Sequence, residues 1–376
     1  MRDYARVVGA TRVEHQRVIG PLQRCQAVRQ KAFFIKSQNN GSKQIRRAQL
    51  APGRPGVTNR QLYPNVYFVT MQRTAYFKQW AAFFLLGGFC WGTSYFWIKI
   101  ALAEIGPLTL VALRVTLACM AIWAWVLVQK IPFPTSAKEI GVMALLGITN
   151  VALPFVLISW GETRIDSGLT GLLTATMPLF TTLIAHRFIA NDRITVPKTI
   201  GVVLGFSGAG ILLSRDLGPG AVSFNLWGQA AVIGGALCYA SSAVYNRRLL
   251  HGQNPLVITA CSLPPAAVIM WVLAPLVEAP FTLPRLPITW LATAWLALIG
   301  TALAYPLAFF LVHTWGPTRT SLVTYVIPAT AVALGVIVLK ESLDWQLALG
   351  GLLIVMGIAT VNWRTQAPRR IRFISQ

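Results

Sequence analysis

Ten long apolar segments constrain the fold more than any other feature of this sequence. Each approaches the roughly 17 to 25 residues that an α-helix needs to cross the hydrocarbon core of a bilayer. With 55% hydrophobic and only 12% charged residues, the chain is also too apolar for a soluble protein of its length. We therefore expect an all-α integral membrane protein with ten transmembrane helices, at about 80–100, 108–128, 140–160, 168–189, 197–213, 226–246, 256–277, 288–311, 319–339 and 346–363.

The N-terminal part of the chain, residues 1–70, differs in character from these segments. It holds 13 Lys and Arg against two acids, Asp3 and Glu14, an excess of 11 within a net charge of +22. We expect a basic disordered tail or a spurious extension upstream of a start at Met71, and a second basic, cytoplasmic tail at 365–376. The other basic residues are scattered at the ends of apolar segments, so they form no continuous face for nucleic acid.

The basic residues beside the apolar segments predict an orientation in the membrane. If the N-terminal end is cytoplasmic, the connections on that side hold 14 Lys and Arg even without residues 1–70, and the opposite connections hold five. Cytoplasmic connections of membrane proteins carry the excess of Lys and Arg. We therefore expect a multi-pass protein of the cell (inner) membrane with both termini in the cytoplasm.

The sequence also repeats itself at an offset of 148 to 150 residues. GGFCWGTSYFWIK (87–99) aligns with GALCYASSAVYNR (235–247), and ATMPLF aligns with YVIPAT, which pairs two prolines. We expect residues 75–215 and 222–364 to be two copies of one unit of five spans. Because five is odd, the second copy enters the membrane from the opposite side. Such inverted repeats enclose a cavity near the bilayer midplane and expose it alternately to either side, so the pattern predicts a carrier.

These residues resemble the drug/metabolite transporter superfamily, specifically EamA-type proteins with two copies of a five-helix repeat. The resemblance rests on WGTSYFWIKIALAEIGPLTLVALR in the first two spans, on the prolines of ATMPLF and YVIPAT, and on LKESLDWQLALGGLLIVMGIATV at the end. It covers about residues 75–364. The chain departs from the family pattern at Lys340, which replaces a glycine, and at Asn191, where the first copy is expected to have glutamate. The resemblance implies an exporter of amino acids or other small metabolites and leaves the cargo open.

Arg114 is the one basic residue after Met71 that lies away from the ends of the apolar segments. It lies about eight residues into the second span, roughly 12 Å deep, and should face the interior of the bundle. All eleven acids fall in the tail, in loops or at helix ends, and Glu104 and Glu278 are the nearest candidates for a partner. Two roles stay open for Arg114: binding carbonyl groups of a neighbouring helix, and contacting a carboxylate or similar anion of a substrate. The resemblance also implies an arginine at this position, in the ALR motif.

Other polar and aromatic residues within the spans are candidates for the wall of a substrate cavity, although each could instead make an interhelical hydrogen bond or anchor the helix at the interface. Together with the arginine, the candidates are Trp91, Ser94, Arg114, Asn150, Tyr239, Tyr305 and Tyr325. Prolines inside spans remove helix hydrogen bonds and introduce kinks that can serve as hinges. The candidate hinges are Pro154, Pro178, Pro306 and Pro328.

A membrane-embedded enzyme that handles lipids, or a scaffold, is the alternative to a carrier. Four histidines and five cysteines show no metal-ligand spacing, so we expect no catalysis, no metal and no cofactor. The expected partners are the lipid bilayer and a small-molecule substrate, but no nucleic acid. Protons or a counter-solute, and a homodimer, are left open. Because no acid lies deep in a span, facilitated diffusion or exchange is an alternative to proton coupling.

Overall fold

The structure, a computed structural model, describes residues 77–189, 194–215, 224–250, 252–315, 320 and 322–362. Within these residues every regular element is helical, as the sequence predicts. The helices belong to one compact unit that begins at Lys78. The predictions for residues 1–70, for 365–376 and for Asn191 fall outside the described residues.

The five predicted spans of the first repeat are all helical, and three of them are built from more than one segment. In chain order they are 77–84 with η1 (Leu85–Trp91) and α4 (Ser94–Ala101); α5 (Pro107–Val128); α6 (Ala137–Leu146) with η2 (Gly147–Ala152) and α7 (Leu153–Glu162); α8 (Ser167–Thr174) with α9 (Met177–Phe188); and α10 (Val196–Ser214).

The five predicted spans of the second repeat are also helical. They are α11 (Phe224–Leu249); α12 (Pro255–Val277); α13 (Pro287–Ala294) with η3 (Trp295–Leu303) and α14 (Ala304–Trp315); α16 (Val323–Ile337); and α17 (Trp345–Asn362). Among the described residues, eight helices are long and apolar enough to cross a membrane. The two predicted spans that fall short are α16, with 15 residues, and α11, which has 26 residues but is more polar.

The start of many of these helices follows from proline chemistry. Proline suits the first turn of a helix because its fixed φ matches the helix and its missing N–H would have no partner there. Pro107, Pro197, Pro255 and Pro287 occupy this place in α5, α10, α12 and α13. At α12 the preceding Asn254 also caps the helix, accepting a hydrogen bond from the Leu256 N–H at 3.0 Å.

The third and eighth spans share an unusual local geometry at equivalent places of the two repeats. Each passes through a π-helical segment, η2 or η3, and each has a proline shortly after it, Pro154 or Pro306. A proline leaves the carbonyl four residues earlier without its helix hydrogen bond, and a wider π turn accommodates that disruption. The sequence indicated a kink at these prolines, and the structure places a π segment before each.

The two repeats are inverted relative to each other. α5 and α12, which correspond in the repeat alignment, lie in contact: the Trp123 Nε1–H donates to the Ala260 carbonyl at 2.8 Å, and the Trp271 Nε1–H donates to the Thr116 hydroxyl at 2.8 Å. As the residue number rises along α5 it falls along α12, so these two helices are antiparallel. Corresponding helices of the two repeats therefore cross the bundle in opposite directions.

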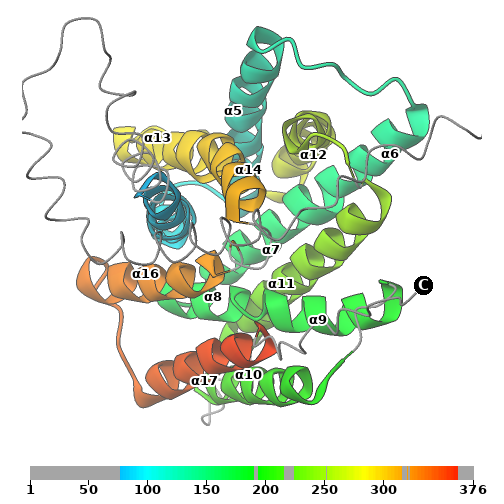
Figure 1. Ribbon diagram of the computed structural model, residues 1–376. Coiled ribbons are helices and arrows are strands. Elements are labelled where there is room, and N and C mark those ends of the chain that lie inside the picture. The colour runs from blue at the N-terminus through cyan, green and yellow to red at the C-terminus, as the bar shows by residue number, and fades with distance from the viewer. Residues whose placement is uncertain are drawn as a thin grey trace, which may run out of the picture. The chain divides into compact units, whose positions relative to one another are not determined.

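α10 and α17, the fifth and tenth spans, also correspond and also run antiparallel, side by side in Figure 1. Glycines make their close contact possible. A Cβ added at Gly201 would lie 2.5 Å from the Gly357 carbonyl oxygen, and one at Gly208 would lie 2.6 Å from the Gly350 carbonyl oxygen. Small residues that let backbones approach in this way are typical of helix pairs in membranes.

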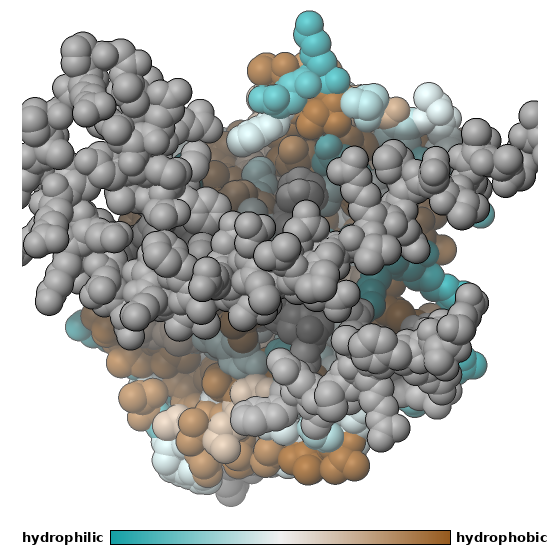
Figure 2. Space-filling view, viewed as in Figure 1, coloured by the Kyte–Doolittle hydropathy of each residue, from teal (hydrophilic) through white to brown (hydrophobic). Residues whose placement is uncertain are grey.

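Apolar side chains cover the outside of the bundle. Figure 2 shows hydrophobic surface along α16, α17 and α10, and on α12 and α17 the residues Val268, Val272, Leu276, Leu352 and Met356 are all exposed. A soluble protein does not expose such continuous apolar surface, whereas a lipid-facing surface requires it. The chain is thus built as a multi-pass membrane protein.

Candidate functional site

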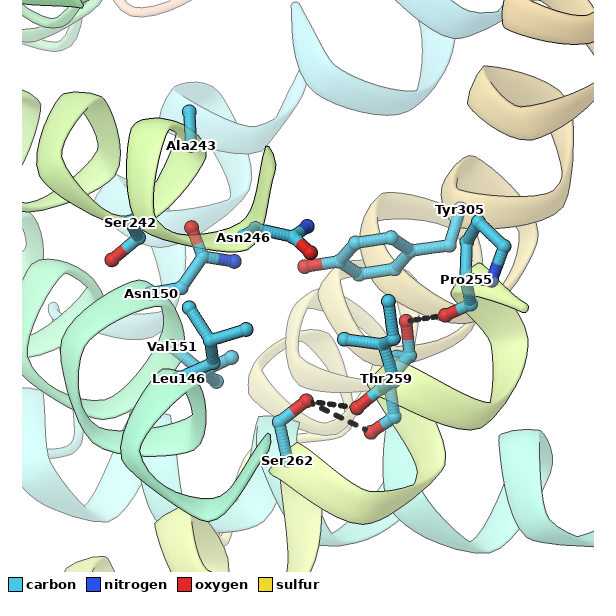
Figure 3. Close-up of a pocket in the computed structure, with 11 residues that line it drawn as sticks. Leu146, Asn150, Val151, Ser242, Ala243, Asn246, Pro255, Thr259, Ser262 and Tyr305 are labelled. Carbon is cyan, nitrogen blue, oxygen red and sulfur yellow. Dashed lines mark hydrogen bonds between the residues drawn. The ribbon is translucent and has the colours of Figure 1, made fainter. Parts of the chain in front are cut away.

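A cavity of about 220 Å³ lies between the two repeats. η2 and the end of α6 supply the wall from the first repeat, and α11, α12 and α14 supply the wall from the second. Its lining, shown in Figure 3, consists of Leu146, Asn150, Val151, Ser242, Ala243, Asn246, Pro255, Ile258, Thr259, Ser262 and Tyr305. We call the end of the bundle that carries residues 250–254 the inner end, and the end that carries 102–106 the outer end. Asn246 and Pro255 place the cavity in the inner half.

The polar groups of the cavity fall into two sets. The hydroxyls of Thr259 and Ser262 donate to carbonyls of their own helix, at Pro255 and Ile258, and Ser242 donates to the Thr149 hydroxyl at 3.0 Å. By contrast, among the described residues no hydrogen bond is formed by the Asn150 amide, the Asn246 amide or the Tyr305 hydroxyl. Figure 3 shows the Asn246 and Tyr305 groups pointing toward each other. These groups are free to bind a polar solute.

Arg114 lies behind this cavity, toward the outer end, and is only 6% exposed. Its guanidinium carbon lies 3.9 Å from the centroid of the Phe155 ring, and its Nε–H donates a long hydrogen bond of 3.4 Å to the Thr301 hydroxyl. Tyr95, Tyr239 and Tyr305 are close enough to interact electrostatically with the guanidinium. Because Tyr305 also lines the cavity, it links the cavity to Arg114.

The repeat alignment relates Arg114 to a residue of the cavity. The offset of 148 residues that pairs GPL (106–108) with NPL (254–256) also pairs Arg114 with Ser262. Arg114 therefore stands in the outer half at the place that Ser262 takes in the inner half. A guanidinium stacked on Phe155 fills the outer position, whereas the inner position borders an open cavity. The two halves of the molecule are alike in fold and unlike in packing.

The structure separates the sequence-predicted cavity residues into three groups. Asn150 and Tyr305 line the cavity. Ser94 and Tyr239 lie near Arg114: a Cβ at Gly300 would lie 3.2 Å from the Ser94 oxygen and 3.7 Å from an Arg114 nitrogen, and Tyr239 packs against Phe155 with ring centroids 6.5 Å apart.

The third group packs elsewhere. The Tyr325 hydroxyl accepts a 3.1 Å hydrogen bond from Asn362 of α17. Trp91, the last residue of η1, packs in an apolar cluster formed by residues of η1 and α14. Neither belongs to the cavity lining. Of the predicted hinges, Pro178 starts α9 after a break at 175–176, whereas Pro328 lies inside the continuous helix α16.

Sequence reasoning missed Asn246, Thr259 and Ser262. Asn246 precedes two arginines and resembles an ordinary polar helix end, and α12 is apolar on all sides, so its sequence does not indicate which face is inward. One signal was available for Ser262, its alignment with Arg114.

The two acids closest to Arg114 in the sequence prediction have other partners. The Glu104 carboxylate accepts hydrogen bonds from the Arg285 and Leu286 N–H groups at 2.6 and 3.1 Å. The Glu278 carboxylate accepts from the Leu108 and Thr109 N–H groups at 2.6 and 3.0 Å. Each carboxylate therefore satisfies the free N–H groups at the start of a helix of the other repeat.

A third carboxylate, Glu341, makes the same kind of contact. It accepts hydrogen bonds from the Ser167 and Gly168 N–H groups of α8 at 2.7 and 3.0 Å. Arg215 adds ion pairs to Asp166 at 3.0 Å and to Asp344 at 2.8 Å. All of these contacts lie at the outer end, and those of Glu104, Glu278, Glu341 and Asp344 join the two repeats. The outer end is closed by polar contacts across the repeat interface.

The structure keeps Glu162 at a helix end, as the sequence predicts, but buries it where water was expected. The third span extends to Glu162, whose side chain is 0% exposed. The sequence placed Glu162 at a helix end, where water is normally accessible. Helices α4, α8 and α11 pack around this end of α7 and remove the residue from solvent.

Comparisons with known proteins agree with this architecture. The sequence profile of the EamA-like transporter family matches twice, at residues 78–214 and 226–363. The chain is 27% identical to the uncharacterized inner membrane transporter YedA of Escherichia coli (strain K12), over 72% of this chain and 87% of YedA. It is 25% identical to a probable terminal-alkyne amino-acid exporter of Streptantibioticus cattleyicolor, over 74% of this chain and 92% of that protein. A solved crystal structure matches with a TM-score of 0.55 and 19% identity, over 75% of this chain and 94% of that chain, which supports the fold alone.

Proposed function

Because the chain belongs to the EamA-like transporter family, we propose that it is a secondary transporter that exports a small metabolite across the cytoplasmic membrane by alternating access. In this proposal both termini lie in the cytoplasm, the side that the distribution of Lys and Arg favours. With this orientation the inner end of the bundle faces the cytoplasm. The described conformation is then one in which the substrate cavity lies on the cytoplasmic side.

The observation that carries this proposal is the difference between the two halves of an inverted pair of repeats. The inner half has a cavity with unpaired polar groups, and the outer half is closed by carboxylates of one repeat bound to helix ends of the other. Exchanging the conformations of the two repeats would open the outer half and close the inner half. That exchange is the movement that a carrier needs.

The chemistry of the cavity supports a small polar or amphipathic solute such as an amino acid. Its volume of about 220 Å³ lies below the roughly 300–1,000 Å³ of pockets for drug-sized ligands. The Asn150 and Asn246 amides each offer a donor and an acceptor, which suits ammonium and carboxylate groups alike. Leu146, Val151 and Ile258 provide apolar contact for a side chain. Arg114, next to the cavity through Tyr305, provides the positive charge that would attract a carboxylate.

Transport by purified protein in liposomes tests the proposal. Liposomes that contain the protein are tested with a panel of amino acids, related amines and small organic acids, with and without a pH gradient. Liposomes without protein serve as the blank. We expect saturable movement of at least one class of solute. Absence of transport for the whole panel, with correctly inserted protein, would contradict the proposed function.

Two tyrosines provide matched variants for the same assay. Tyr305→Phe removes a hydroxyl from the cavity, and Tyr325→Phe removes a hydroxyl that binds Asn362 away from it. A hydrogen bond to the substrate is worth about 1.4 kcal/mol at most in such a site, so we expect up to a tenfold rise in KM for Tyr305→Phe. Tyr325→Phe should leave KM unchanged. Equal effects of both variants would mean that the cavity does not bind the solute.

A further inference from the structure

Glu162 is a buried acid whose surroundings are not explained by a role in helix structure. It is the last residue of α7, it is completely buried, and neither carboxylate oxygen has a hydrogen-bond partner among the described residues. A buried carboxylate without a partner is costly, and ionisable groups in membrane spans are commonly part of substrate or proton pathways. The burial of Glu162 therefore indicates a functional role for its carboxyl group.

The charged and titratable groups around Glu162 come from several elements. Lys99 of α4 donates from its ammonium group to the carbonyls of Glu162 and Ile165, at 2.8 Å each. Tyr95, one turn earlier in α4, and Glu341, from the segment after α16, are the other titratable side chains that interact with the carboxyl group.

Within the part of the chain that the structure describes, the remaining elements packed here contribute no free charge. α8 and the first nine residues of α11 (224–232) contain no titratable side chain. Arg164 and Asp166, which follow Glu162 in the chain, are engaged elsewhere: Arg164 stacks on the Trp160 ring at 3.6 Å, and Asp166 pairs with Arg215. Lys99 is thus the cation that faces Glu162.

The two neighbouring carboxyl groups differ in a way that assigns their roles. Glu341 accepts two backbone N–H groups at the start of α8, so both of its oxygens already have hydrogen-bond donors. Glu162 accepts none, so its carboxyl group can bind a proton without breaking a hydrogen bond. Lys99 is bound to carbonyls rather than to the carboxylate, and its flexible side chain can turn to the carboxylate when the proton leaves.

We propose that Glu162 is the proton-binding group of this protein, with Lys99 as its alternating counter-ion. The assignment rests on the proposed function as a carrier, because it supplies that carrier with its coupling ion. The third span carries Asn150 of the cavity on η2 and Glu162 at the end of α7. Beside Glu162, Glu341 joins α8 to the second repeat at the closed outer end. A change in the charge of Glu162 therefore acts at the contact that must open in alternating access.

Chemical modification tests the proton site without any knowledge of the substrate. N,N′-dicyclohexylcarbodiimide reacts with a protonated carboxyl group in apolar surroundings: the O–H adds across one C=N bond, and the O-acylisourea rearranges to a stable N-acylurea with no leaving group. We expect mass spectrometry of the detergent-purified full chain to find the adduct on Glu162, increasing as the pH falls. Glu341 should stay unmodified.

Glu162→Gln and Glu341→Gln are the matched variants for this test. Elution as a single species and an unfolding midpoint near that of the wild type show that each is folded. The adduct should disappear in Glu162→Gln and remain on Glu162 in Glu341→Gln. No adduct on Glu162 at any pH, or an adduct whose yield does not depend on pH, would overturn the proposal.

Coupling is measured in liposomes with whichever solute the panel identifies. The solute is placed inside the liposomes, and a proton gradient is directed inward. This gradient should raise the rate of export by the wild type at least tenfold over the rate without a gradient. Glu162→Gln should retain solute exchange without a gradient and lose the acceleration. Acceleration of equal size in Glu162→Gln would overturn the proton assignment while leaving the carrier intact. A panel without any transported solute would reject the carrier, and the modification result would still decide whether Glu162 binds a proton.

Discussion

Arg114 shows how a cation is held inside this bundle without a carboxylate partner. Among the described ion pairs none involves Arg114, and its guanidinium instead lies against the face of Phe155 and donates to the Thr301 hydroxyl. A cation over an aromatic ring away from water is worth about 2 kcal/mol or more. The prediction that Arg114 binds carbonyl groups finds no hydrogen bond of that kind among the described residues, where Thr301 is the acceptor.

Substitution of Arg114 should therefore affect transport in a graded way. Arg114→Ala removes the charge next to the cavity, and we expect transport to fall at least a hundredfold. Arg114→Lys keeps the charge but lacks the planar guanidinium that stacks on Phe155, so we expect a loss of about tenfold. Initial rates in liposomes measure both, with the inserted amount of protein as the control. Normal transport by Arg114→Ala would remove any role for this residue.

Lys340 is a second residue with unusual local geometry, at a position where the resemblance to EamA-type proteins implies a glycine. Its φ is +60°, in the left-handed region where a side chain is unfavourable and glycine is not. The turn at Lys340 ends the segment after α16 and brings Glu341 onto the start of α8. The side chain itself is exposed, so the backbone conformation alone favours the glycine that the resemblance implies.

We expect Lys340→Gly to stabilise the protein by about 1 kcal/mol, because it removes the strain of a left-handed residue without loss of packing. Thermal unfolding in detergent measures the effect. Lys138→Gly, in the first turn of α6, is the matched control and should destabilise the protein, since glycine is unfavourable in a helix. A lower midpoint for Lys340→Gly than for the wild type would contradict the interpretation.

Helix contacts in this protein depend on glycine where the fifth and tenth spans cross. A Cβ at Gly357 would lie 2.5 Å from the Gly205 nitrogen and 2.6 Å from the Gly201 carbonyl oxygen, both backbone atoms that cannot rotate away. Gly210, also in α10, has open space at its Cβ position. Substitution of Gly357 therefore tests close helix packing, whereas substitution of Gly210 tests only the effect of glycine on the helix backbone.

Gly357→Ala should force α10 and α17 apart and lower the free energy of unfolding by about 1–3 kcal/mol. Gly210→Ala should leave the free energy unchanged or raise it by about 0.5–1 kcal/mol, because alanine is the better helix former. Unfolding in denaturant with both variants side by side distinguishes them. Equal stability would mean that the two helices are not in close contact.

Because of the contact between Glu104 and the start of α13, we expect the stability of the outer end to depend on pH. The Thr289 side chain, together with the Arg285 and Leu286 N–H groups, lowers the pKa of Glu104, which lies in the loop after α4. A carboxyl group with a lowered pKa in the folded state stabilises the protein above its unfolded-state pKa of about 4.3 and loses that contribution as the pH falls through the folded value.

We therefore expect Glu104→Gln to lower the unfolding midpoint at pH 6 and to bring it closer to that of the wild type as the pH approaches 3. Midpoints in detergent across this range measure the difference between the two proteins, so effects of other acids cancel. A difference that stays constant over the whole range would show that ionisation of Glu104 does not contribute.

At the scale of the whole molecule, the inverted repeat makes a prediction about access from water. Asn246 lines the cavity of the inner half, and Ile98, its counterpart at an offset of 148 residues, is 3% exposed in the outer half. In a background without native cysteines, we expect Asn246→Cys to react readily with a small water-soluble thiol reagent and Ile98→Cys to react at least tenfold more slowly. Similar rates for both would contradict a bundle that is closed at its outer end.

The sequence alone predicted the helices and their inverted arrangement, because these properties are local or follow from counting. A long apolar run must form a helix in lipid, and an odd number of spans per repeat must reverse the second copy. The bounds of the third span, expected at 140–160 and found at 137–162, differ by few residues. Those few residues matter, since Glu162 lies among them.

Only the tertiary structure decided which side chains meet. Helices such as α12 are apolar all round, so their sequences do not indicate an inward face, and Thr259 and Ser262 could not be placed beside Asn150. For the same reason Tyr305 and Tyr325 looked equivalent, although only Tyr305 lines the cavity. The burial of Glu162 depends on helices α4, α8 and α11 meeting at one point, and such a meeting is set by packing across the whole bundle, which no stretch of sequence contains.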